Sequence, residues 1–416
     1  MLKFITASDA RALDRLLERE AAADAALTRR VAAIIADVRR GGDRQLLTFA
    51  RRFDKLSGPI ELTRDEIEAG ARATPARVRK ALRVAARNIT RVARTQVPRG
   101  GRLTVAPGVS VEQRVTPLDR VGCYVPGGRY PLPSSLLMTA IPARVAGVGE
   151  VIVACPRPEP AVLAAAVEAG VSRVFRMGGT HAIAALAYGT ATIPRVDKIV
   201  GPGNAYVATA KALVARDCAI DFYAGPSEIV IISTIGNAEW IAADLLAQAE
   251  HDVDARAILL TSSKRLATQV HRAVTKLMPA EGSTGEGPAR EALRRRGGIV
   301  LTKSVRESID LATRIAPEHL VCDDRETALQ VKTAGAVFIG PYTAQAAGDY
   351  ATGSNHVLPT NGAARFRGGL SAADFVRVSS VQTLTAQGLK RLAPSIIALA
   401  EAEGLSAHAR SIKVRL

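Results

Sequence analysis

The sequence predicts an α/β protein with two units, each built on a parallel sheet, and with helical segments at both ends of the chain. Short runs of Val, Ile and Leu alternate with alanine-rich helical segments, and this alternation occurs twice. The chain has 416 residues, more than a single typical domain, and 48% of them are hydrophobic, which is enough to form two cores.

The N-terminal part of the chain is predicted to be mostly helical, over residues 10–54 and again over about 75–96, where the sequence at 98–102 ends the helix. Five arginines of the second helix recur every three or four residues, opposite an apolar stripe: Arg79, Arg83, Arg87, Arg91 and Arg94. The net charge of +17 raises the alternative of a nucleic-acid-binding protein. No aromatic residue interleaves with these arginines, so we interpret them as a solvated helix face and expect no nucleic-acid partner.

After a predicted strand at residues 108–115, the chain enters the two alternating series. The first series has predicted strands at 151–154, 174–175, 198–200 and 229–232, with helices at 161–169, 181–188 and 205–216. The second has strands at 257–260, 299–301 and 336–339, helices ending near 277 and 315, and a loop at 281–288. Beyond residue 369 the pattern is largely helical, with a possible strand at 376–381.

Glycine-containing motifs follow four of the predicted strands, at residues 124–128, 178–179, 201–204 and 224–228. In open α/β sheets ligands bind at this position, and glycine lets the backbone approach them closely. Each motif alone is equally compatible with a simple turn, and no GxGxxG fingerprint occurs in the chain. Four such motifs in succession favour a binding cleft.

Four side chains are candidates for a single metal site: Gln248, His251, Asp349 and His408. Gln248 and His251 are three residues apart in a predicted helix, so they lie on one face. Asp349 adds a hard oxygen ligand, and imidazole with carboxylate suits zinc or manganese. The four cysteines form no CxxC pair, which argues against a Cys-ligated site and against a disulfide framework.

Glu318 and His319 form a candidate acid–base pair. Pro317 disfavours helix continuation, so both residues are predicted at the start of a strand. Adjacent Glu and His side chains can act together if their environments separate their pKa values. A Glu-His dipeptide alone is weak evidence for a catalytic site, and the candidate metal ligands elsewhere in the chain are what support this interpretation.

With these motifs in order, the chain resembles the histidinol dehydrogenase family over nearly its whole length. The matching segments are residues 126–128, 131–149, 201–204, 224–228, 245–252, 316–320, 348–350, 355–359 and 403–408. The resemblance implies two related incomplete Rossmann-like domains with parallel sheets, plus helical N- and C-terminal extensions. The implied division is an extension at 1–22, a discontinuous first domain at 23–122 and 233–370, a second domain at 123–232, and a C-terminal extension at 371–416.

The resemblance also implies a zinc-dependent, NAD-linked four-electron oxidation of L-histidinol to L-histidine via L-histidinal, the last steps of histidine biosynthesis. One zinc ion per subunit would be held by Gln248, His251, Asp349 and His408. Glu318 and His319 would be catalytic, and the positions matching cofactor contacts are Tyr124, His181 and Asn204. The substrate would meet the four zinc ligands together with Ser227, His319 and Glu403. The C-terminal residues would complete the site of a partner in a homodimer.

The chain departs from the usual family pattern at three places. Gln345 stands where a carboxylate is usual, His181 where a glutamine is usual, and residues 128–131 differ from the commoner small residues. A paralogue that oxidises another alcohol, such as a sulfopropanediol or an amino alcohol, therefore stays open. The N-terminus lacks a signal-peptide core and no apolar run is long enough to span a bilayer, so a cytoplasmic enzyme without a membrane partner is expected.

Overall fold

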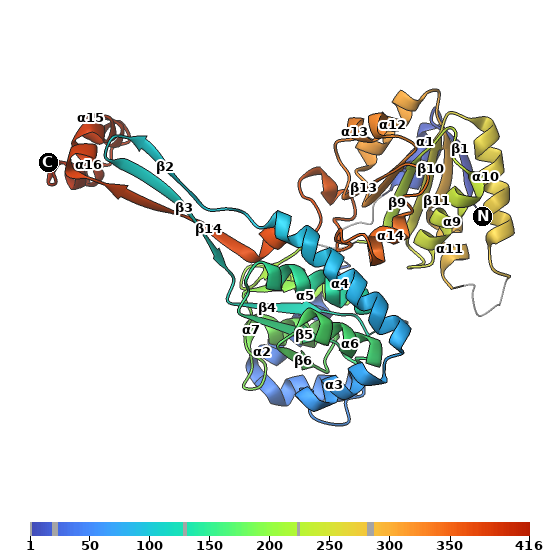
Figure 1. Ribbon diagram of the computed structural model, residues 1–416, viewed down its shortest axis with the longest axis horizontal. Helices are drawn as coiled ribbons and strands as arrows, with labels where there is room; N and C mark the ends of the chain where they lie inside the picture. Colours follow the sequence, from blue (N-terminus) through green and yellow to red (C-terminus); the bar gives the residue numbers. More distant parts are fainter. Residues whose placement is uncertain (1, 19–23, 128–130, 223–224, 281–286) are drawn as a thin grey trace.

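The computed structural model describes residues 2–18, 24–127, 131–222, 225–280 and 287–416. These residues form two lobes, each around a parallel sheet, and an arm that projects away from both lobes (Figure 1). Gly128 and the rest of the departing segment up to residue 130, Ala224, and most of the predicted loop at 281–288 lie outside the described residues.

The first lobe surrounds a five-stranded parallel sheet with the strand order β6-β5-β4-β7-β8. Its strands are β4 (Arg120–Tyr124), β5 (Glu150–Ala154), β6 (Arg173–Phe175), β7 (Lys198–Val200) and β8 (Ala219–Ile220). Side chains alternate between the faces, as a strand requires. One face packs against α3 (Arg64–Ala73), α4 (Ala76–Gln96), α5 (Pro133–Val145) and α6 (Pro160–Ala169). The other face packs against α2 (Ala25–Asp54), α7 (Gly179–Tyr188) and α8 (Ala205–Val214).

The second lobe surrounds a six-stranded parallel sheet with the order β1-β11-β10-β9-β12-β13. Its strands are β1 (Lys3–Thr6), β9 (Glu228–Ile232), β10 (Arg256–Thr261), β11 (Gly297–Leu301), β12 (His319–Cys322) and β13 (Ala336–Ile339). One face is covered by α9 (Ala238–Ala249), α10 (Lys264–Leu277) and α11 (Ala289–Arg296). The other is covered by α1 (Ala10–Leu17), α12 (Val305–Ile315) and α13 (Arg325–Gln330).

The two sheets repeat one topology. In each, the first strand of the series lies at the centre, the second and third lie on one side, and the fourth and fifth lie on the other. This is the Rossmann order without its sixth strand. The predicted fold class, with two related incomplete Rossmann-like units, is confirmed.

The predicted domain division does not match the packing of the N-terminal half. Helices α2, α3 and α4 were assigned with residues 233–370, but their apolar faces are buried against the five-stranded sheet. The predicted N-terminal extension instead supplies β1, which pairs with β11, and α1, which covers the same sheet. An amphipathic pattern shows that a helix has a buried face, but it does not show which sheet buries it.

The arm is an antiparallel three-stranded sheet with two helices at its tip (Figure 1). It contains β2 (Gly101–Ala106), β3 (Val109–Pro117), β14 (Val376–Leu384), α15 (Ala386–Ala402) and α16 (Ser406–Lys413). The predicted strand at 376–381 is confirmed and is three residues longer. Between β13 and the arm lie α14 (Gln345–Tyr350) and the short helices η1 (Ala363–Arg365) and η2 (Ala372–Phe375). Within the described part of the chain, no helix is both long and apolar enough to cross a membrane.

Candidate active site

Glu318 and His319 lie at the amino edge of the six-stranded sheet, where β12 begins, and both are buried. The His319 Nδ1 atom is 3.1 Å from the carbonyl oxygen of Glu228. A carbonyl only accepts, so Nδ1 carries the proton and Nε2 is left as an acceptor. Burial lowers the pKa of His319 to about 4. At neutral pH the ring is therefore an uncharged base with Nε2 as its basic atom.

The Glu318 carboxylate is held by the same strand edge. Its Oε2 accepts a hydrogen bond from the backbone N–H of Glu228 at 2.8 Å. Burial raises the pKa of Glu318 well above its usual value, and the nearby carboxylates of Glu228 and Asp349 act in the same direction. Glu318 and His319 thus have pKa values displaced in opposite directions, which is the arrangement that divides acid and base roles.

Gln248 and His251 lie at the end of α9, at the same edge of the sheet. Gln248 is fully buried, yet among the described residues neither atom of its amide group has a hydrogen-bond partner. The His251 Nδ1 atom donates to the carbonyl of Ala247 at 3.0 Å, which leaves Nε2 free. Histidines that bind metals commonly fix the ring in this way. A buried amide without a partner and a ring held by its backbone both suit metal ligands.

Asp349 joins this group because α14 packs against α9. Its Oδ1 atom lies 3.8 Å from His319 Nε2. Among the described residues, no cluster of three or more His, Cys, Asp and Glu side chains has the arrangement of a metal site. Asp349 thus lies beside His319, and His251 is near enough to influence the pKa of His319, while Gln248 shares the end of α9, which packs against α14.

The structure does not bring Glu403 and His408 to this group within one chain. Both residues are exposed, Glu403 at the end of α15 and His408 in α16. These helices form the tip of the arm, far from the six-stranded sheet (Figure 1). His408, the fourth candidate ligand, and Glu403, a candidate substrate-binding residue, are therefore exposed at the tip of the arm.

Two side chains that were not predicted as site residues, the half-buried His356 and the buried Gln345, hold Asp349 in place. His356 Nδ1 donates to the backbone carbonyl of Asp349 at 2.9 Å, and its Nε2 is 3.2 Å from Ser135 Oγ in α5. Gln345 Nε2 lies 2.6 Å from Asp349 Oδ2. Because α5 belongs to the other lobe, the site lies where the two lobes meet. His356 lies in the segment 355–359, which matches the pattern named in the sequence analysis, and this match could have identified it as a site residue.

The candidate cofactor residues lie at the carboxyl edge of the five-stranded sheet, beside its topological switch point. Tyr124 ends β4, and its Oη accepts from the backbone N–H of Gly179 at 3.1 Å. Gly201 follows β7 with φ +118°, and a Cβ there would lie 2.1 Å from the Tyr124 carbonyl oxygen, so only glycine fits. Asn204 caps α8 through Oδ1. Ser227, a candidate substrate-binding residue, is not at this edge. It lies half-buried just before β9, at the amino edge of the six-stranded sheet.

His181 does not face this edge as an open cofactor contact. Its side chain is 2% exposed, and Nε2 is 2.7 Å from Asp54 Oδ2, which also accepts from the backbone N–H of Gly178 at 2.9 Å. The rings of Phe49 and Phe53 pack beside it. Within the single chain the partner of His181 is Asp54, and its contact with NAD stays a prediction. His181 and Asp54 brace the turn at Gly178 from inside the lobe.

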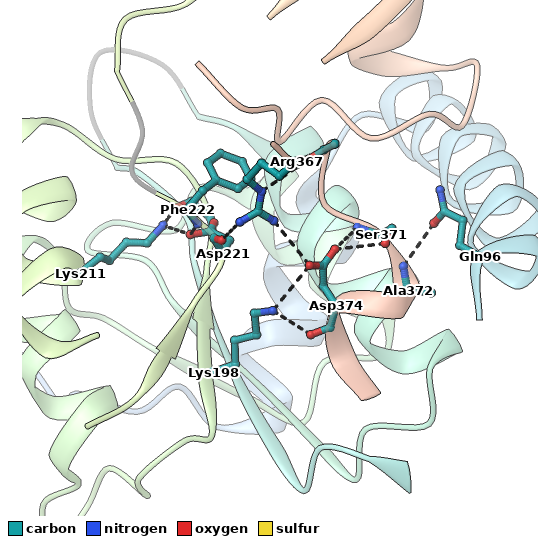
Figure 2. A network of polar contacts seen from close by, with 11 residues as sticks. Gln96, Lys198, Lys211, Asp221, Phe222, Arg367, Ser371, Ala372 and Asp374 are labelled. Carbon is teal, nitrogen blue, oxygen red and sulfur yellow. Dashed lines mark hydrogen bonds and ion pairs between the residues drawn. The ribbon is translucent and has the colours of Figure 1, made fainter. Parts of the chain in front are cut away.

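A buried ionic network fixes the loop after β7 (Figure 2). Lys211 forms an ion pair with Asp221 and donates to the carbonyl of Gly201 at 2.9 Å, while Asp221 Oδ2 accepts from the Gly201 N–H at 2.8 Å. Arg367 donates to the Asp221 carbonyl and lies over the Phe222 ring. The same network continues to Asp374, just before the arm, so the loop after β7 and the base of the arm are held together.

Replacing Lys211 with Met is expected to lower the free energy of unfolding by about 3–5 kcal/mol, because it leaves the buried Asp221 without its cation. Denaturant unfolding measures the change. Lys276→Met removes an exposed ion pair with Glu239 and serves as the control, with little expected effect. Equal stabilities of the two variants would contradict this role of the network.

The comparisons with known proteins point to one family. The sequence model of the histidinol dehydrogenase family matches residues 17–416. A histidinol dehydrogenase of Geobacter sulfurreducens is 47% identical over 399 residues, covering 92% of each chain. One of Methylococcus capsulatus is 47% identical over 416 residues, covering 97% of this chain and 95% of the relative. The crystal structure of histidinol dehydrogenase from Elizabethkingia anophelis superposes with a TM-score of 0.94 at 33% identity, covering 100% of this chain and 98% of that chain.

Proposed function

The chain belongs to the histidinol dehydrogenase family, and we propose that it catalyses the NAD-linked four-electron oxidation of L-histidinol to L-histidine via L-histidinal in histidine biosynthesis. The observation that carries the proposal is the neutral His319, whose acceptor atom Nε2 lies 3.8 Å from Asp349 Oδ1. A biosynthetic enzyme that draws on the cellular NAD pool is expected in the cytoplasm.

Gln248, His251 and Asp349 are the residues that would hold zinc in each subunit. The partnerless amide of Gln248 and the free Nε2 of His251 support this assignment, as does the mixture of nitrogen and oxygen donors. When bound, zinc supplies a positive charge that fixes the amine and imidazole nitrogens of the substrate. His408 of the partner subunit would be the fourth ligand.

The proton transfers fall to the chain's own side chains. In the first oxidation His319 Nε2 takes the hydroxyl proton while the carbinol hydrogen leaves as hydride to NAD, which gives the aldehyde. In the second, Glu318 takes a proton from the water that adds to the aldehyde carbon. The water oxygen bonds to that carbon, and the resulting hydrate anion loses a second hydride to a second NAD and becomes the acid. Burial of Glu318 and His319 keeps bulk water away from both steps.

We further propose that two chains form a homodimer by exchanging their arms. The arm carries exposed apolar side chains on both its sheet and its helices: Leu103, Val105, Val378, Leu399, Leu405 and Val414. Exposed apolar surface concentrated on a projecting element marks a contact with another chain. His251 is exposed in the single chain, and so are Glu403 and His408 at the arm's tip. Arm exchange would bring these three residues together.

The substrate assignment is tested by adding L-histidinol to purified protein with zinc and NAD. The expected result is formation of about two NADH per histidinol consumed, because a four-electron oxidation needs two hydride acceptors. Omission of histidinol is the control. A panel of sulfopropanediol and amino alcohols run beside it tests the paralogue: turnover of one of these, with none of histidinol, would contradict the proposal.

A further inference from the structure

Gln345 occupies a position between the candidate metal ligand and the candidate base. It begins α14, one helical turn before Asp349, and is 1% exposed. Its Nε2 lies 2.6 Å from Asp349 Oδ2 and 3.3 Å from His319 Nε2. Its Oε1 is buried and has no hydrogen-bond partner in the described part of the chain. One amide nitrogen therefore meets groups that come from α14 and from β12.

Only one orientation of the Gln345 amide gives each of these contacts a donor and an acceptor. An amide nitrogen has two protons to donate and accepts nothing. A carboxylate oxygen accepts, and His319 Nε2 also accepts because the proton of that ring is on Nδ1, facing the Glu228 carbonyl. If the amide were turned over, Oε1 would face the carboxylate oxygen at the shorter of these distances, with no proton between them. A carboxylate side chain in place of Gln345 would likewise have no proton to donate.

We propose that Gln345 is a positioning residue that aims one oxygen of Asp349 at the metal. By binding Asp349 Oδ2, the amide leaves Oδ1 as the oxygen directed toward His319. Hydrogen bonds of this kind orient metal-ligating carboxylates and are part of a metal site's affinity. This inference rests on the proposed function, because Asp349 and His319 have their roles there.

The test uses Gln345→Met, which keeps the length of the side chain and removes both donated hydrogen bonds. Zinc affinity is measured on the whole purified protein by competition with a chromogenic chelator. The expected result is a zinc dissociation constant raised about 10–100-fold, as for other losses of a ligand's hydrogen-bond partner. Gln330→Met, at an exposed glutamine of α13, is the matched control and should bind zinc like the wild type.

A second readout separates positioning from a general structural effect. At saturating zinc, Gln345→Met should have kcat lowered about tenfold or more, because Asp349 no longer directs a fixed oxygen at the metal, while KM for NAD is unchanged. Gln345→Asn keeps the amide but shortens its reach, and should show an intermediate loss in both measurements. This variant also serves if the Met variant does not fold. Zinc affinity and kcat equal to wild type in a folded variant would overturn the inference alone, whereas wild-type protein that binds no zinc would overturn the proposed function with it.

Discussion

Replacing His319 with Asn is expected to lower kcat for histidinol oxidation by about 10²–10⁴-fold, the range that general acid–base catalysis contributes. The variant keeps a side chain of similar shape but has no basic nitrogen to take the hydroxyl proton. Steady-state formation of NADH from histidinol measures the loss. Zinc content should stay at the wild-type value, because Gln248, His251 and Asp349 are untouched.

Glu318→Gln is the contrasting variant for the same measurement. It should form the first NADH from histidinol at a rate near wild type and then stall, because the amide cannot take a proton from the attacking water. A single-turnover experiment separates the two hydride transfers. His319→Asn should be slow from histidinol but able to use histidinal. Equal losses in both steps for both variants would contradict this division of roles.

His408→Ala is expected to lower kcat/KM by more than about 100-fold, since loss of hydrogen-bond partners around a metal ligand alone costs 10–100-fold. The physical reason is that one of four zinc ligands disappears, although His408 lies on an exposed helix far from the pocket of its own chain. Bound zinc and activity are measured together. His271→Ala, on α10 away from the site, is the control. A fully active His408→Ala enzyme would show that the arm does not complete the site.

The hydrophobic pattern was sufficient to predict two strand–helix series and two parallel sheets. It placed the strand at 229–232 in the first series, which was wrong, because β9 lies in the middle of the six-stranded sheet. It did not show that β1 belongs to the six-stranded sheet, because Lys3–Thr6 is a short edge strand with a mixed burial pattern. It also could not assign α2, α3 and α4 to a sheet. The amphipathic pattern of α4 predicted its buried residues, among them Leu82 and Ile89, but the partner of that face depends on tertiary packing.

Helical spacing correctly placed Gln248 in α9, but the helix ends at Ala249 and His251 lies just beyond its C-cap. Pro317 predicted the strand start at His319. The pairing of His181 with Asp54 was not predictable, because 127 residues separate them and neither stands in a local motif. Gln345 had a usable signal, since it lies four residues before Asp349 and such side chains meet on a helix. The contact of Gln345 with His319 could not be predicted from the sequence, because it depends on how α14 packs beside β12.

The central claim is that each site uses its own His319 and the partner subunit's His408, and hybrid dimers test it most directly. Mixing inactive His319→Asn subunits with inactive His408→Ala subunits gives hybrids in which one of the two sites has both side chains intact. With random pairing half of the dimers are hybrids, so roughly a quarter of wild-type activity should return. Activity no greater than that of the two inactive parents, in a mixture shown to contain hybrid dimers, would contradict the account.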